Sequence, residues 1–290
     1  MHSKTSDFNQ ALRAAAAAGL DRLDAQLLLL HALGRPAHDR AWLLAHDTDP
    51  LPPGAQAAFD ALCAGRRAGR PVAYLVGEKE FFGLPLAVDA RVLVPRPDTE
   101  TLVVWALDVL ADAARPDAAE VLDLGTGSGA IALALAHATA RPGAGPAARV
   151  TALDASPDAL AVARDNARRL GLAVAFLHSD WFSAVAGRRF DLLVSNPPYI
   201  AAGDPHLDAL RHEPTAALVA GADGLSDLRT LVAGAPAHLR PGGWLLLEHG
   251  WDQAGAVQDL LRAAGFARVQ SRSDLAGIAR CTGGLWPSHG

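Results

Sequence analysis

Apolar residues recur at helical spacing through the N-terminal part of the chain. Leu23, Leu27 and Leu30 lie three or four positions apart, and Gly34-Arg35-Pro36 marks a turn after them. No cluster of chemically reactive side chains accompanies this pattern. We therefore predict a small all-helical domain over residues 1–71 and interpret it as a substrate-docking or structural module.

The hydrophobic pattern changes after this helical region. The residue types of Val72, Tyr74, Leu75 and Val76 favour extended chain, and a second apolar stretch follows over residues 81–88. Glycines between and within these stretches are turn signals. The pattern predicts a β-hairpin linker over residues 72–100.

Short apolar runs alternate with amphipathic segments in the rest of the chain. Ser156 and Pro157 are a helix N-cap and first position, and Gly171 is a stop signal, so the pattern predicts a helix that ends at Leu170. This alternation is typical of a mostly parallel sheet with helices on both faces. We predict an α/β, Rossmann-like domain over residues 101–290, with strands at 121–124, 149–153, 174–177, 192–195 and 244–247, a helix at 130–138 and a loop at 141–148 that does not touch the site.

Composition and charge narrow the class of protein. The 290 residues are 50% hydrophobic and 20% charged, which suits a globular protein and excludes a disordered one. No run of 18 apolar residues predicts a transmembrane helix, and the first 30 residues lack a signal-peptide layout, so we expect a cytoplasmic protein without membrane contact. Two cysteines and scattered histidines predict no metal site. A net charge of −5 argues against DNA binding.

A glycine-rich loop follows the first predicted strand of the α/β domain. In Asp123-Leu124-Gly125-Thr126-Gly127-Ser128-Gly129-Ala130, glycines at alternate positions let the backbone turn sharply and approach a ligand closely. The next helix begins here with unpaired N–H groups. The loop predicts that a nucleotide-like ligand binds after this first strand. By itself, the loop does not choose between NAD and S-adenosylmethionine.

Two further acidic residues follow the next strands. Asp154 can accept hydrogen bonds from both ribose hydroxyls of such a ligand, although a carboxylate at a helix N-terminus would look the same. Asp180 can accept from an adenine amine, and the Trp181 indole can cover the ring face. The alternative for Trp181 is a side chain that caps the core.

The most informative motif is Asn196-Pro197-Pro198-Tyr199, which follows an apolar strand. An amide nitrogen is a poor nucleophile because its lone pair is delocalised. The Asn196 side-chain oxygen and the Pro197 carbonyl can accept both N–H groups of such a nitrogen and favour an attacking geometry. Tyr199 can pack on the planar group, and the prolines stiffen the turn. We predict Asn196, Pro197 and Tyr199 as catalytic and Asn196 to Tyr199 as substrate-binding.

Together, the glycine loop and the Asn-Pro-Pro-Tyr motif resemble class I S-adenosylmethionine-dependent methyltransferases that act on planar NH2 groups. The chain is also similar to one family among them, the release-factor glutamine methyltransferases of the HemK (PrmC) type. That similarity spans about residues 70–290 and rests on Pro71–Gly77, Val94–Glu100, Glu213-Pro214, Ala217–Gly221, Leu247–Gly250 and Arg280–Gly284. One departure is Ser179, where the family commonly has glycine.

The resemblance implies S-adenosyl-L-methionine as cofactor and the glutamine of the Gly-Gly-Gln loop of class 1 peptide chain release factors as substrate. It also implies that the cofactor contacts Asp154, Trp181, Asn196 and the glycine-loop residues Gly125, Thr126, Gly127, Ser128 and Gly129. The roles of four residues stay open: Arg96 and Glu100 can line the site or form a structural clamp, and Glu213 can order the loop after Tyr199. For Glu248, together with His249, packing at the core edge is favoured over acid–base chemistry.

Three alternative functions share some of these features. A methyltransferase acting on a ribosomal-protein glutamine would use the same motif. A DNA adenine-N6 methyltransferase also presents Asn-Pro-Pro-Tyr but usually adds a basic target-reading domain. The acidic catalytic half and the near-neutral helical half of this chain argue against that function. A non-catalytic dinucleotide-binding protein would use the glycine loop and leave residues 196–199 without a role.

Overall fold

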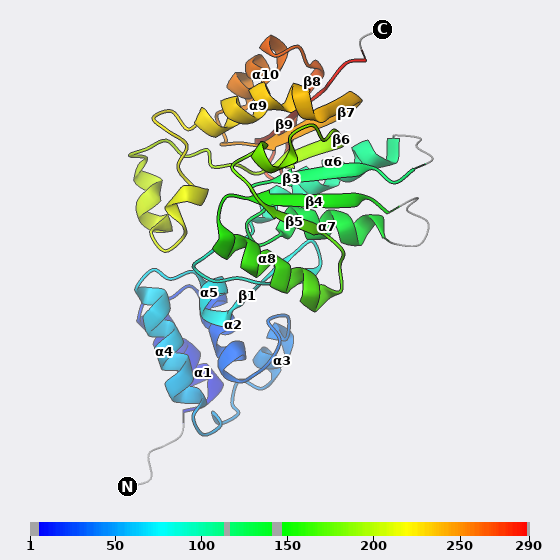
Figure 1. Cartoon of the computed structure of the whole chain (residues 1–290). Coiled ribbons are helices and arrows are strands. Elements are labelled where there is room, and N and C mark those ends of the chain that lie inside the picture. The colour runs from blue at the N-terminus through cyan, green and yellow to red at the C-terminus, as the bar shows by residue number, and fades with distance from the viewer. Residues whose placement is uncertain (1–5, 113–116, 141–146, 289–290) are drawn as a thin grey trace. The chain divides into compact units, whose positions relative to one another are not determined.

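The computed structural model describes residues 6–112, 117–140 and 147–288. Contacts divide the chain into two units, Met1–Glu78 and Lys79–Gly290 (Figure 1). The first contains α1 (Phe8–Ala17), α2 (Arg22–Ala32), α3 (Arg40–Ala45), α4 (Ala55–Arg67) and α5 (Val72–Val76). The second contains the strands β2 (Leu84–Ala87), β3 (Glu120–Leu124), β4 (Arg149–Asp154), β5 (Ala175–His178), β6 (Phe190–Ser195), β7 (Leu239–Glu248), β8 (Ala267–Ser273) and β9 (Ala279–Leu285), and β1 (Glu78–Phe81) begins at the boundary. Its helices are α6 (Glu100–Asp112), α7 (Ala130–Thr139), α8 (Pro157–Leu170), α9 (Ser226–His238) and α10 (Ala254–Ala263), with short 3-10 turns at Pro97–Thr99, Ser183–Val185, Pro205–Leu210 and Thr215–Ala217.

The first unit is helical, as predicted. Asp7 caps α1 in a capping box with Gln10, and Asp21 caps α2 through its side chain. Leu28, Leu29 and Leu30 are all fully buried, because α2 contacts each of the other four helices and so buries more than one face. None of the helices described here is long and apolar enough to cross a bilayer.

The prediction of extended chain over residues 72–76 is wrong, because this segment is the helix α5. Pro71 precedes it, and Gly77 ends it with a left-handed φ of 77°. Its apolar side chains pack on the core of the helical unit. The hairpin is therefore confined to β1 and β2, joined by a turn at Phe82 and Gly83. The division into docking domain, linker and methyltransferase domain stays a prediction.

The second unit has a seven-stranded sheet in the order β5-β4-β3-β6-β7-β9-β8. The strands from β5 to β7 pair in parallel, and β9 pairs antiparallel with both β7 and β8. The predicted strands and the helices α7 and α8 are present within one or two residues of their expected bounds, except that β7 begins five residues earlier. Residues 141–146 of the predicted loop lie outside the described residues.

Alternate strand residues face two separate hydrophobic clusters. In β6, Leu192 and Val194 pack with residues of α6 and α7, whereas Leu193 packs with residues of α9 and α10. Helices therefore cover both faces of the sheet, as the alternation of elements predicts (Figure 1). The parallel strands β3, β4 and β6 end together at one edge, and each is followed by one of the polar motifs.

Candidate active site

A cavity of about 420 Å³ lies at the carboxyl ends of β3, β4 and β6, which is a size typical of small-molecule sites. Seven of the predicted site residues line it: Gly125, Gly127, Asp154, Asp180, Trp181, Asn196 and Pro198. The cavity thus brings together the glycine loop, both acidic residues and the Asn-Pro-Pro-Tyr motif.

The glycine loop is folded around Asp154. The Gly127 N–H donates to Oδ2 of Asp154 at 2.8 Å, and the Ser156 N–H donates to Oδ1 at 2.8 Å. Gly125 and Gly127 both have left-handed φ values, of 74° and 56°. Burial raises the pKa of Asp154, and the two backbone N–H groups counteract this rise. A carboxylate has further lone pairs, so Asp154 can still accept from a ligand.

Thr126, Ser128 and Gly129 do not line the cavity. Their contacts instead stabilise the backbone of the glycine loop. Thr126 Oγ1 donates to Asp123 at 2.6 Å, and the Ser128 carbonyl accepts from the buried Asn166 side chain at 3.0 Å. Gly129 is the N-cap of α7. Burial raises the pKa of Asp123 to about 7, and its Oδ1 has no partner among the described residues.

Trp181 lies over the glycine loop. A Cβ on Gly125 would be 3.7 Å from the Trp181 indole ring. The backbone φ of Trp181 is 41°, an unusual value for a residue other than glycine. Ser179 holds this turn, because its Oγ donates to the Trp181 carbonyl at 2.7 Å and accepts from the Ala184 N–H at 2.9 Å. The serine that departs from the family pattern therefore stabilises the backbone turn.

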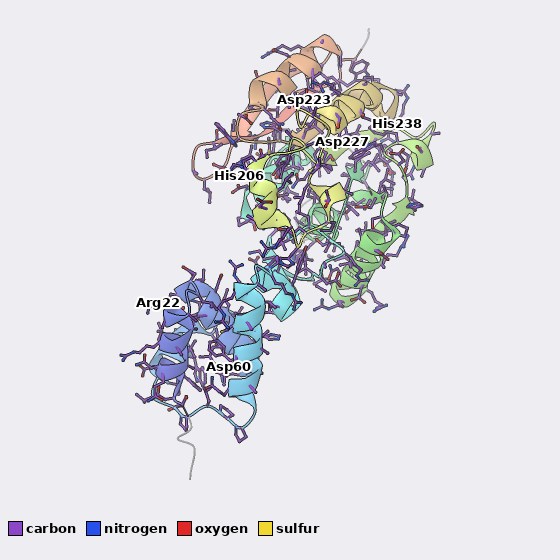
Figure 2. The ribbon with its side chains drawn as sticks, turned by 90° about the vertical axis from the view of Figure 1, so that its left-hand side faces the viewer. Arg22, Asp60, His206, Asp223, Asp227 and His238 are labelled. Atoms are coloured by element: carbon purple, nitrogen blue, oxygen red, sulfur yellow. The ribbon has the colours of Figure 1, made fainter. Side chains whose placement is uncertain are left out.

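Asp227, which the sequence did not single out, also lines the cavity. It lies in the first turn of α9, whose last residue is His238 (Figure 2). Burial and the nearby charge of Asp180 raise the pKa of Asp227, while a hydrogen bond from the Trp181 side chain lowers it. Asp227 thus adds a second carboxylate to the cavity lining beside Asp180 and Trp181.

Asn196 extends from the end of β6 into the cavity lining. Its Nδ2 donates to Thr99 Oγ1 at 3.2 Å, and its Oδ1 has no protein donor among the described residues. Pro197 and Tyr199 do not line the cavity. Tyr199 packs beside the α9–α10 cluster, and burial raises the pKa of its phenol.

The side chain of Gln253 ties the loop after β6 to two neighbouring loops, which the sequence did not predict. Its Nε2 donates to the Tyr199 carbonyl at 3.0 Å and to the Gly224 carbonyl at 3.3 Å. Its Oε1 accepts from the Gly250 N–H at 2.8 Å. These contacts fix the backbone that follows Asn196.

Gly224→Ala is expected to destabilise the protein and reduce activity. A Cβ there would be 2.3 Å from the Tyr199 carbonyl oxygen, so that loop would have to move. Gly187→Ala is the matched control, because Gly187 has a similar φ, of 74° against 72°, and no atom within 4 Å of the added carbon. We expect thermal or urea unfolding to show Gly224→Ala less stable than the control by about 1–3 kcal/mol. Equal stability of the two variants would contradict this tight contact.

Three of the four residues with open roles form structural contacts, and Arg96 pairs with Glu213 rather than with Glu100. Glu213 is buried, at 6% exposed, accepts from the Val94 N–H at 3.0 Å and forms an ion pair with Arg96. Glu213 thus joins two segments that contribute to the cavity lining, one through Leu93 and the other through Pro214. Glu100 accepts from the Phe82 N–H at 3.0 Å and so holds the hairpin to α6. No group of three or more potential metal ligands occurs in the described part of the chain.

The parallel sheet, the glycine-rich turn after its first strand and the acidic residues after the next two strands define a Rossmann-like class I methyltransferase. Family models agree: residues 104–262 match the Methyltransferase small domain and residues 7–77 the PrmC N-terminal domain. The 16S rRNA N2 G1207 methyltransferase from T. thermophilus, solved with AdoMet and guanosine, has the same fold, with a TM-score of 0.51 at 22% identity over 72% of this chain and 49% of that one.

Curated relatives match nearly the whole chain. The Release factor glutamine methyltransferase of Bordetella pertussis is 53% identical, over 92% of this chain and 95% of the relative. The protein of the same name from Pseudomonas aeruginosa is 51% identical, over 91% and 92%. The chain therefore belongs to the release factor glutamine methyltransferase family.

Proposed function

We propose that this chain transfers a methyl group from S-adenosyl-L-methionine to the side-chain nitrogen of glutamine in the Gly-Gly-Gln motif of class 1 peptide chain release factors. The observation that supports this most is that Asn196 lines the same cavity as the glycine loop and Asp154. An amide-recognising side chain thus lies beside a nucleoside-sized site. Relatives named Release factor glutamine methyltransferase, which are 53% and 51% identical to this chain, support the same substrate.

The residues of the cavity fit S-adenosylmethionine. A Cβ added at Gly127 would meet no atom within 4 Å, so the backbone is open to a ligand there. Asp154 has acceptor capacity for a ribose diol, and Asp180 has it for an adenine amine, with the Trp181 ring next to Gly125. When bound, this cofactor supplies an electrophilic methyl group on a cationic sulfur.

The protein's contribution to the reaction is orientation of the glutamine amide. The Asn196 Oδ1 is available to accept one amide N–H, because its Nδ2 already donates to Thr99. The second proposed acceptor is the Pro197 carbonyl, which belongs to the peptide bond between Pro197 and Pro198, a residue of the cavity lining. Two fixed acceptors hold the nitrogen with its lone pair directed at the methyl donor, and such positioning supplies much of the rate in group-transfer reactions. The extra amide proton passes to solvent water after the N–CH3 bond has formed.

We also propose that the helical unit docks the release factor, and that the reaction takes place in the cytoplasm, where translation occurs. The family model that matches residues 7–77 supports a role shared with relatives for this unit.

Mass spectrometry of a release factor incubated with the enzyme and labelled cofactor tests the proposal. We expect the mass of one added methyl group on the Gly-Gly-Gln peptide and none on a release factor whose motif glutamine is replaced by alanine. Parallel reactions with ribosomal proteins and with DNA test the two alternative substrates. Label on either of those, with none on the release factor, would contradict the proposed substrate. Calorimetry with NAD and S-adenosylmethionine checks the cofactor.

A further inference from the structure

Glu248 is a buried carboxyl group beside Asn196 with no role in the mechanism described so far. Ser195 of β6 pairs with Leu247 of β7, so Asn196 and Glu248 leave their neighbouring strands at the same level of the sheet edge. Glu248 is only 1% exposed, and its Oε2 has no hydrogen-bond partner among the described residues. Burying a carboxyl oxygen without a hydrogen bond costs folding free energy. A residue kept at this cost is a candidate for a functional role.

Thr99 connects Glu248 to Asn196. It is 4% exposed, and its Oγ1 accepts from Asn196 Nδ2 at 3.2 Å. Hydrogen bonding from the Thr99 and Tyr199 side chains lowers the pKa of the buried Glu248 carboxyl group, which makes the Thr99 hydroxyl the group that couples Glu248 to Asn196. An ionised carboxylate can only accept, and a threonine hydroxyl has one proton to give. With Glu248 ionised, Thr99 therefore donates to Glu248 and must act as an acceptor toward Asn196.

We propose that Glu248 is a positioning residue that fixes which end of the Asn196 amide faces the substrate. Through Thr99, the Glu248 carboxylate keeps the Asn196 NH2 group directed at the Thr99 hydroxyl. The Asn196 Oδ1 acceptor then faces the NH2 group of the substrate glutamine. This inference rests on the proposed function, because the acceptor is needed only if the substrate presents N–H donors.

A neutral group at position 248 removes this control. A protonated glutamic acid, or a glutamine, can donate to Thr99, and Thr99 is then free to donate its own proton to Asn196 Oδ1. The Asn196 amide can turn over in that arrangement and present its NH2 group to the substrate NH2 group. Two donors then face each other, and the hydrogen bond that orients the nucleophile is lost.

The protonation state of Glu248 therefore matters around neutral pH. Burial is the largest cause that raises its pKa, to about 7, and the charge of Asp98 on the 3-10 turn adds to this. Arg280 of β9 and the hydrogen bonds from Thr99 and Tyr199 counteract it. Cys281 of β9 pairs with Glu248, and burial raises the pKa of its thiol, while burial lowers the pKa of the adjacent His249 imidazole. Cys281 and His249 are therefore both neutral around pH 7. Glu248 loses its negative charge as the pH falls through about 7.

Methyl transfer by Glu248→Gln tests the proposal, with kcat, KM for the release factor and the calorimetric Kd of S-adenosylmethionine measured across the range around pH 7. The change replaces one oxygen by NH2 and keeps the volume. We expect kcat to fall about 10²-fold, the scale of one lost orienting hydrogen bond, with little change in cofactor Kd. The wild-type rate should fall on acidification through about pH 7, and the variant's rate should lose this dependence.

Thr99→Val and Thr99→Ser form a matched pair that tests the hydroxyl link while position 248 keeps its glutamic acid. Valine removes the hydroxyl link at nearly constant volume, so we expect a loss of kcat similar to that of Glu248→Gln. Serine keeps the hydroxyl and should recover most of that loss. If the glutamine variant does not fold, this pair decides alone: equal rates for valine and serine would overturn the proposal.

The outcomes separate this inference from the proposed function. A wild-type enzyme that does not methylate the release factor would contradict the proposed function itself. A wild type that does so, together with a Glu248→Gln variant of equal kcat and unchanged pH profile, would overturn the positioning role alone. A variant with lost cofactor binding and unaltered kcat at saturation would also overturn it, because Glu248 would then act on the cofactor site.

Discussion

Replacing Asn196 by alanine is expected to slow methyl transfer about 10²- to 10³-fold at saturating cofactor, the scale typical of losing one catalytic hydrogen bond in a preorganised site. The Asn196 amide lines the cavity and keeps Oδ1 available by donating to Thr99. Alanine removes the acceptor that orients the glutamine nitrogen. Single-turnover methylation of a release factor, followed with labelled cofactor, measures the effect on the chemical step directly.

Cofactor affinity is the internal control for the Asn196→Ala variant. The glycine loop, Asp154 and Trp181 are unchanged in it, so calorimetry should give a Kd for S-adenosylmethionine within a few-fold of wild type. A rate close to wild type would refute the catalytic role of Asn196. A large loss of cofactor affinity with normal turnover at saturation would reassign this residue to cofactor binding.

Local signals explain why the elements around the cavity could be predicted from the sequence. The helix α8 begins and ends at its expected residues, because the Ser156 side chain accepts from the Ala159 N–H, Pro157 is its first residue and Gly171 takes a left-handed φ after it. Such caps depend on a few neighbouring residues. The buried parallel strands read as continuous apolar runs for the same reason, since both of their faces are covered.

Elements whose form depends on distant contacts could not be predicted in this way. The five apolar residues of α5 fit a strand or a buried helix equally well, and packing on the helical unit selects the helix. In β9, Gly283 and Gly284 weaken the strand signal. A Cβ at Gly283 would be 2.5 Å from Leu246, so glycine is present there because the neighbouring strand packs so closely.

The candidate site, like the fold, could be predicted where local motifs determine it and not where distant contacts do. The motifs identified residues that lie around one cavity, because each follows a predicted strand of one sheet. They did not distinguish lining residues such as Gly127 from supporting ones such as Thr126, since both belong to one short loop. Thr99 belongs to the Val94–Glu100 segment that carries the family resemblance, but no role could be assigned to it from the sequence, because it lies 97 residues before its partner Asn196.

Replacing Asp154 by alanine is expected to weaken binding of S-adenosylmethionine about 100-fold, while turnover at saturating cofactor changes far less. Two hydrogen bonds from a ribose to a carboxylate are worth about 3 kcal/mol together, which corresponds to a factor of about 10² in Kd. The variant also removes the acceptor for the Gly127 N–H, so the glycine loop loses a contact that shapes the cavity. Calorimetry with the cofactor measures the loss.

Asp158→Ala is the matched control, because it removes the same charge from the first turn of α8 at an exposed residue that does not line the cavity. We expect it to bind the cofactor as wild type does. Equal loss of affinity in both variants would mean that charge near the helix N-terminus, rather than a direct contact of Asp154, governs binding. With Asn196→Ala lowering kcat and Asp154→Ala raising Kd, the two variants separate the part of the cavity that holds the cofactor from the part that orients the glutamine.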